Sequence, residues 1–155
     1  MSVSTLQTLA ILETEKKVKI FLVDDDAIFL RLVEIEFLQY TDFEVETYAT
    51  GELCLQNLSR NPHVVVLDYH LDGIEKKAMT GLEVLDNIKL QFKDMPVVML
   101  SSQYKIEIAV NCMHHKAFDY IVKSETAIIR LRKVITAILH YRKMDKLLTW
   151  YMDRA

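Results

Sequence analysis

Glycine, proline and cysteine are scarce in this 155-residue sequence, which contains three glycines, two prolines and two cysteines. So little glycine and proline excludes collagen-like and low-complexity chains, and a composition 51% hydrophobic and 26% charged is that of a globular domain. Cys54 and Cys112 lack the C-x-x-C spacing of metal and redox motifs, so we expect two buried, reduced thiols. The length suits one domain with a core of its own.

The sequence also lacks a long apolar run, a basic N-terminal segment and a large net charge. No run approaches the roughly 20 apolar residues that cross a bilayer, and Glu13 and Glu15 interrupt the modest apolar stretch near the N-terminus, which argues against a secretory signal. The net charge of -3 gives no general attraction to nucleic acid or to an anionic membrane. We therefore expect a cytoplasmic protein with no direct nucleic-acid or membrane partner.

From about residue 17 onward, short apolar strands alternate with helical patterns. Strands are expected at 17–23, 43–48, 63–67, 96–100 and 118–122. Helices are expected over 27–40 with Asp26 as N-cap, from Thr50 through Leu58, after a capping box of Thr80 and Glu83, over 104–113, and from Ser124 to about Trp150. Five βα units in a row predict an α/β fold, a doubly wound five-stranded parallel sheet with helices on both faces.

Polar side chains follow four of the five expected strands. Asp24 and Asp25 follow the first, Asp68 ends the third, Ser101 follows the fourth and Lys123 follows the fifth. Because functional groups gather at the carboxyl edge of a parallel sheet, we expect these side chains to meet there. Each one alone is typical of a turn, a cap or a solvated charge, but their coincidence at one edge favours a functional site.

The chemistry of such a cluster can be read from its groups. Three carboxylates in one pocket repel each other, and a hard cation such as Mg2+, which prefers oxygen ligands and phosphate oxygens, relieves that repulsion. A lysine and a hydroxyl on the same edge can stabilise a transferring phosphoryl group. Since no cysteine or catalytic histidine lies at a strand end, a carboxylate would have to be the nucleophile.

The chain from about Lys17 to Met144 resembles the receiver domain of bacterial response regulators, of the CheY-like superfamily. The matching segments are VDDD at 23–26, VVVLD at 64–68, GLEVL at 81–85, PVVMLSS at 96–102 and DYIVK at 119–123. The resemblance implies a strand order 2-1-3-4-5. It divides the chain into an N-terminal extension (1–16), a receiver domain (17–144) and a C-terminal helical extension (145–155).

The resemblance also implies roles for the edge residues and partners for the chain. Asp68 is the expected phosphoryl acceptor, with Lys123 and Ser101 assisting. Mg2+ is the expected cofactor, held directly by Asp25 and Asp68, mainly through water by Asp24, and by the backbone carbonyl of His70. Ser101 and Tyr120 are the expected switch residues. The expected donor is a sensor histidine kinase or a histidine phosphotransfer protein, and the chain is expected to be a signalling domain, not an enzyme.

Two departures from the family pattern stand out. The stretch 69–80 after the acceptor is longer than usual and lacks the usual Met-Pro, and its charge predicts a solvated flap. Ser124 follows Lys123 where the family has a proline, and the Lys-Pro bond of the family is commonly cis. A non-proline cis bond costs about 2.5–4 kcal/mol, so the geometry of the Lys123–Ser124 bond is left open. The side chain of His70, two residues past the acceptor, could influence the lifetime of the phosphoryl group.

Two other readings of function are open. A phosphatase of the haloacid dehalogenase type also uses a strand-end aspartate and Mg2+, but Tyr69 and His70 follow Asp68 here, so the second aspartate of its D-x-D pattern is missing. A pseudo-receiver that only binds proteins is expected to have lost the acceptor, the acidic pair or the lysine, and this sequence keeps all of them.

The C-terminal helix is the least family-typical segment. Ile128, Leu131, Ile135 and Ile138 can form its buried stripe, but beyond Tyr141 the helix has little domain left to cover. There it presents Leu147, Leu148, Trp150 and Tyr151, an apolar group that indicates a homodimer or a partner contact. Packing against Leu6, Leu9 and Leu12 of the N-terminal extension is the alternative.

Overall fold

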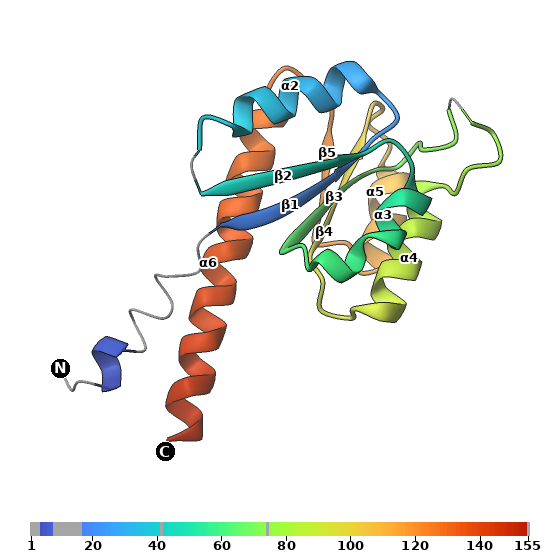
Figure 1. Cartoon of the computed structure of the whole chain (residues 1–155). Coiled ribbons are helices and arrows are strands. Elements are labelled where there is room, and N and C mark those ends of the chain that lie inside the picture. Colours follow the sequence, from blue (N-terminus) through green and yellow to red (C-terminus); the bar gives the residue numbers. More distant parts are fainter. Residues whose placement is uncertain (1–3, 8–16, 41, 74, 155) are drawn as a thin grey trace.

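Runs of β-branched and other apolar residues form a five-stranded parallel sheet in the order β2-β1-β3-β4-β5, which confirms the predicted fold class and strand order (Figure 1). The computed structural model describes residues 4–7, 17–40, 42–73 and 75–154. The three central strands carry the most buried side chains, and every residue of β3 and β4 is buried. The strands are β1 (Val18–Val23), β2 (Phe43–Tyr48), β3 (Val64–Asp68), β4 (Val97–Ser101) and β5 (Asp119–Val122).

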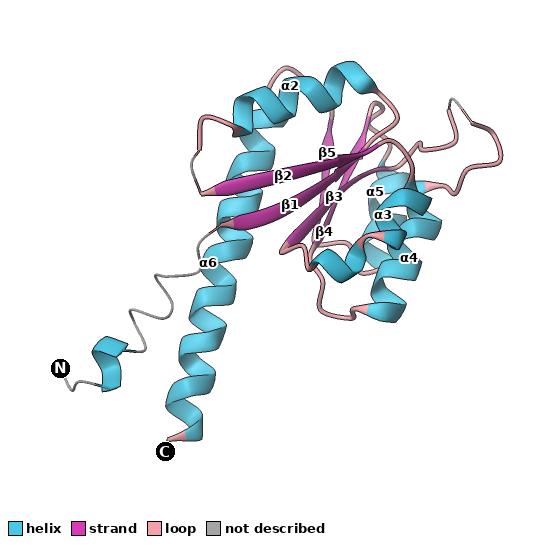
Figure 2. Cartoon of the chain, viewed as in Figure 1, coloured by secondary structure: helices cyan, strands magenta, loops and turns pink. Residues whose placement is uncertain are grey.

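Helices cover both faces of the sheet, as Figure 2 shows. Alternate strand residues point to opposite faces, so the core divides into two layers. Val65, Leu67 and Met99 pack on one side with α3, α4 and α5, while Val66, Val98 and Leu100 pack on the other side with α2 and α6. The helices are α2 (Ala27–Phe37), α3 (Gly51–Gln56), the 3-10 turn η1 (Leu58–Arg60), α4 (Gly81–Gln91), α5 (Ile106–His114) and α6 (Ala127–Asp153).

The predicted caps begin three of these helices. Asp26 Oδ1 accepts from the N–H groups of Ile28 and Phe29, each at 3.1 Å. Thr50 Oγ1 accepts from Leu53 N at 3.2 Å, and the hydroxyl of Thr80 accepts from the N–H three residues later at 3.3 Å. Each bond satisfies a backbone donor that the first turn of a helix leaves unpaired.

The start and the end of α6 correct the prediction. Ser124 does not open this helix, because its N–H donates to Val122 O at 2.8 Å and its carbonyl accepts from Ala127 N at 3.0 Å, which forms a turn. The helix begins at Ala127 and continues past Trp150 to Asp153. The described backbone contains no cis peptide bond, so the Lys123–Ser124 bond is trans.

Two further sequence predictions concern the cysteines and the membrane. Cys54 and Cys112 are free and fully buried, as predicted. Burial raises the pKa of the Cys54 thiol to about 12 and that of Cys112 to about 11. Within the described ranges, no helix combines the length and the apolar character needed to cross a membrane.

Candidate functional site

The strand register brings the predicted polar residues to one edge of the sheet. Val23 at the end of β1 pairs with Leu67, so Asp24 and Asp68 follow side by side. Ser101 is the last residue of β4 and pairs with Val122, the residue before Lys123. The topology therefore places the residues that sequence analysis selected at the carboxyl ends of four strands.

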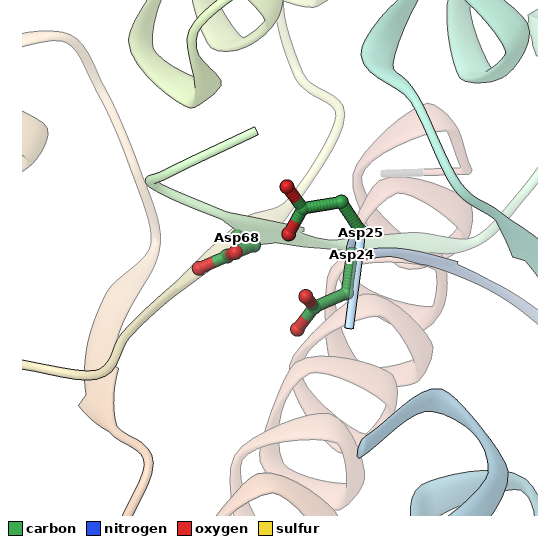
Figure 3. Close-up of side chains that lie close together, drawn as sticks. All are labelled: Asp24, Asp25 and Asp68. Carbon is green, nitrogen blue, oxygen red and sulfur yellow. The ribbon is translucent and has the colours of Figure 1, made fainter. Parts of the chain in front are cut away.

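The carboxylates of Asp24, Asp25 and Asp68 form a compact cluster, in which an oxygen of each lies within 4.8 Å of the others (Figure 3). Asp24 is fully buried, Asp68 is 4% exposed and Asp25 is half-buried. Among the residues that the structure describes, this is the one group of three or more potential metal-binding side chains. Oxygen ligands of this kind suit a hard divalent cation.

Lys123 supplies the positive charge of the cluster. Its Nζ lies 2.5 Å from Asp24 Oδ2 and 3.6 Å from Asp68 Oδ2, and 4.6 Å from the centre of the Phe29 ring. Asp24 Oδ1 accepts from the N–H of Asp26 at 2.9 Å. The buried Asp24 Oδ2 has no hydrogen bond of good geometry within the described residues, so it depends on the ion pair with Lys123.

The electrostatic balance of the site is visible in the pKa of Asp68, which is raised from 3.8 to about 7. Burial is the main cause and the neighbouring charge of Asp24 is the second, while Lys123 and the backbone N–H of His70 act in the opposite direction. Burial and the charge of Asp24 thus disfavour the ionised form of Asp68. A bound divalent cation would favour that form, and the three carboxylates fit such an ion.

Ser101 and Tyr120 share one backbone acceptor. The buried Ser101 hydroxyl donates to Gln103 O at 3.0 Å, and its oxygen accepts from Gln103 N at 3.2 Å. The hydroxyl of Tyr120 donates to the same carbonyl at 2.8 Å, and the residue is only 7% exposed. The structure thus holds Tyr120 inward and links it to Ser101 through Gln103, a connection that sequence analysis did not find.

An open hollow of about 630 Å3 lies over the cluster and leaves room for a phosphoryl group. Besides the predicted residues Asp25, Asp68, His70 and Lys123, it is lined by five residues that sequence analysis did not assign to the site. Ser102 could have been considered because it follows Ser101. The residue types of Ala27 and Gly73 gave no sign of a functional role, since these residues contribute to the hollow only by where they lie. The full lining is Asp25, Asp26, Ala27, Ile28, Asp68, His70, Gly73, Ser102 and Lys123.

The stretch 69–80 is solvated only in part, which corrects the prediction of a solvated flap. Glu75, Lys76 and Lys77 are exposed. Leu71, however, is 1% exposed in the core, and the N–H of Met79 donates to a carboxylate oxygen of Glu52 at 2.6 Å. Apolar burial and this hydrogen bond anchor both ends of the segment.

Gly81 allows the first turn of α4 to close on the backbone of the acceptor strand. Its N–H donates to Tyr69 O at 3.0 Å. A Cβ at this position would lie 2.7 Å from Tyr69 Cα and closer still to the carbonyl oxygen of Asp68. A larger residue would therefore displace the acceptor backbone.

Comparison with known proteins identifies the same fold and sequence pattern. The family model described as response regulator receiver domain matches residues 20–136. Protein-glutamate methylesterase/protein-glutamine glutaminase 2 of Rhodopseudomonas palustris (strain BisB18) is 31% identical over 137 residues, which are 84% of this chain. The chain spans only 36% of that relative's length.

Two solved structures show the likeness in three dimensions. The receiver domain of NtrX from Brucella abortus is 33% identical with a TM-score of 0.68, over 78% of this chain and 98% of that one. The signal receiver domain of a putative LuxO repressor protein from Vibrio parahaemolyticus has a TM-score of 0.74 at 22% identity, over 85% of this chain and 97% of that one. At that lower identity the likeness supports the fold alone.

Proposed function

This chain belongs to the response regulator receiver domain family of two-component systems, and on that premise we propose that Asp68 accepts a phosphoryl group from a phosphohistidine. The observation that carries the proposal is the setting of Asp68. It is a buried strand-end carboxylate that opens into a hollow, within 4.8 Å of two other carboxylates and 3.6 Å from a lysine Nζ.

The transfer step is a displacement at phosphorus. An oxygen of Asp68 forms the new P–O bond, the P–N bond of the phosphohistidine breaks, and its electron pair returns to the imidazole. Lys123 is placed to pair with a phosphoryl oxygen once Asp68 is phosphorylated, because its Nζ already lies between Asp24 and Asp68. Hydrolysis of the acyl phosphate by water would restore the carboxylate and reset the domain.

We further propose that the site works with Mg2+. The carboxylates of Asp25 and Asp68 and the backbone carbonyl of His70 would hold the ion directly, and Asp24 would hold it mainly through water. When bound, Mg2+ supplies positive charge that offsets the charge on the phosphoryl oxygens. The raised pKa of Asp68 supports this proposal, because burial and the charge of Asp24 disfavour the ionised carboxylate that a bound cation would stabilise.

The switch would start from the hydrogen bonds around Gln103. To donate to a phosphoryl oxygen, the Ser101 hydroxyl must leave the carbonyl of Gln103, which also accepts from Tyr120. When the Ser101 hydroxyl leaves, the Gln103 carbonyl keeps only the hydrogen bond from Tyr120. A movement of Ser101 would in this way be coupled to the position of Tyr120. Phosphorylation would then shift the population between two conformations of the domain, because the phosphoryl group interacts differently with each.

The proposed partners follow from this chemistry. The donor would be a sensor histidine kinase or a histidine phosphotransfer protein in the cytoplasm, and the recipient of the signal a partner protein or an output domain. The chain would act as a signalling domain that promotes only its own phosphorylation and dephosphorylation. The receiver unit would span residues 17–144, and the helical extension 145–155 would provide a contact surface.

Intact mass spectrometry tests the proposal. The protein is incubated with acetyl phosphate with and without Mg2+, beside Asp68→Asn and Asp72→Asn, which each remove one aspartate charge. We expect one phosphoryl group on the wild type and on Asp72→Asn with Mg2+, and none on Asp68→Asn. Equal phosphorylation of Asp68→Asn would overturn the assignment, and no phosphorylation of the wild type would favour a phosphorylation-independent binding domain.

A further inference from the structure

Helix α6 continues well past the sheet that its first half covers. Its buried residues are Ala127, Leu131, Ile135 and Ile138. Beyond Ile138 no residue of this fully described helix is buried, and Figure 1 shows the end of α6 standing clear of the strands. Leu139 is the last residue of the helix that packs against the core, so the residues after it have no core in their own domain to bury against.

A second apolar stripe runs along this free part, on a different face from the buried one. Its residues follow each other at alternating spacings of three and four, the spacing of the core positions of a coiled coil. Tyr141, Met144, Leu148 and Tyr151 are 71%, 54%, 58% and 52% exposed. We call the stripe the α6 seam, and it consists of Ala137, Tyr141, Met144, Leu148 and Tyr151.

The seam lies to one side of the helix face that packs on the domain, and only Tyr141, at its start, borders a hollow of the domain while remaining mostly exposed. Arg142, the residue after the seam's Tyr141, points to the body of the domain instead, because its Nη1 donates to His63 O at 2.9 Å. One helical residue corresponds to a rotation of about 100°, so the seam lies beside the domain-facing side of α6, where a second helix can reach it.

We propose that the α6 seam pairs with the same seam of a second copy of this chain, in a parallel two-stranded coiled coil. Residues that flank the seam support a second copy of the chain as the partner. In a parallel pair, His140 lies across from Asp145 of the second copy, and Leu147 lies across from Met152 of the second copy. An imidazole N–H can donate to a carboxylate, and the two apolar side chains widen the buried strip. Each contact occurs twice by symmetry.

Antiparallel packing fits the same residues less well. A register that places Tyr141 opposite Tyr151 of the second copy also places Asp145 opposite Asp145 of that copy. The like charges would repel each other close to the interface, where water is partly excluded. Charge therefore favours the parallel orientation over this arrangement.

The parallel dimer leaves the phosphoryl-acceptor site accessible. Helix α6 begins just after Lys123, at the carboxyl edge of the sheet, and runs toward the opposite edge. There Arg142 lies near His63, which precedes β3. The seam thus extends from the side of the domain away from the hollow over Asp68. This inference goes beyond the phosphorylation proposal and does not depend on it.

Single-cysteine crosslinking tests the register directly. In a parallel, in-register pair the two copies of residue 148 meet, so Leu148→Cys should form a disulfide dimer on mild oxidation. Lys143→Cys, on another face of α6, is the matched control. Both native cysteines are fully buried, so they should not contribute. We expect about tenfold or more crosslinked dimer for Leu148→Cys than for Lys143→Cys.

Light scattering on the unmodified protein and on Leu148→Glu completes the test. The wild type should approach about 36 kDa, twice the 18.1 kDa of one chain, as concentration rises. Leu148→Glu should keep its far-UV circular dichroism and its phosphorylation but raise the dimer dissociation constant by about 100-fold, because it places two like charges in the seam.

Several outcomes would overturn the proposal. One is equal crosslinking of the two cysteine variants, and another is a dimer mass that Leu148→Glu leaves unchanged. A strict monomer that does not crosslink would show that a segment of the chain itself, or a different protein, covers the seam. Crosslinking of a Met144→Cys, Leu148→Cys double variant, but of neither single variant, would show an antiparallel pair. None of these results bears on Asp68, so the two proposals fail separately.

Discussion

Replacing Asp68 with asparagine should stabilise the folded domain at pH 8 when EDTA removes divalent cations. The ionised carboxylate is 4% exposed and lies beside Asp24, and these two features raise its pKa from 3.8 to about 7. A pKa that is raised on folding means that the folded state binds this proton more tightly than the unfolded state does. The contribution of Asp68 to stability is therefore greatest below pH 3.8 and falls as pH rises to about 7.

The magnitude follows from the size of the shift. Each pKa unit corresponds to about 1.36 kcal/mol, so a rise from 3.8 to about 7 corresponds to a cost of about 4 kcal/mol above pH 7. Asparagine resembles the protonated acid and removes this cost, while Lys123 keeps its ion pair with Asp24. We expect a gain of about 2–4 kcal/mol, because relaxation of the site reduces the full value.

Urea unfolding followed by circular dichroism measures this gain. The wild type, Asp68→Asn and the control Asp72→Asn are compared at pH 8 and pH 5, in EDTA and in Mg2+. The advantage of Asp68→Asn should shrink at pH 5, where Asp68 in the folded wild type is protonated, and in Mg2+, which we expect to bind and stabilise the wild type. An Asp68→Asn protein no more stable than the wild type at pH 8 in EDTA would refute the electrostatic reasoning.

Three other substitutions test separate parts of the site. Asp25→Ala should weaken Mg2+ binding by about tenfold or more without unfolding the domain, and an unchanged Mg2+ titration would contradict its role as a ligand. Ser101→Ala should still accept phosphate but should lose most of the phosphorylation-dependent NMR shifts near Tyr120, so identical shifts in both proteins would disprove the switch. Gly81→Ala should lower the free energy of unfolding by about 1–3 kcal/mol and slow phosphorylation, because its Cβ would meet Tyr69 Cα at 2.7 Å. An unchanged unfolding midpoint would show that the backbone adjusts freely.

The sheet and its polar edge could be predicted from sequence because simple physical rules fix both. A run such as VVVL at 64–67 has no polar face, so it fits only a strand covered on both sides, and every residue of β3 is indeed buried. Once five such strands are parallel, their carboxyl ends share an edge. Asp24, Asp68 and Ser101 are then placed at one edge without any information on side-chain contacts.

Features that depend on tertiary contacts could not be predicted in this way. The acceptor shared by Ser101 and Tyr120 is the backbone carbonyl of Gln103, which any residue type would supply. Ser124 has the side chain of a helix cap, but local hydrogen bonds to Val122 and Ala127 turn the chain first. In each case the sequence carries the group, and only the fold determines its partner.

The most direct test of the phosphorylation proposal is to locate the phosphoryl group in the sequence. The protein is phosphorylated with acetyl phosphate and Mg2+, reduced with borohydride, which converts an aspartyl phosphate to homoserine, and digested for tandem mass spectrometry. The proposal predicts homoserine at residue 68 and unmodified aspartate at residues 24 and 25. Homoserine at residue 24 or 25, or phosphate on a serine or threonine with residue 68 intact, would contradict it.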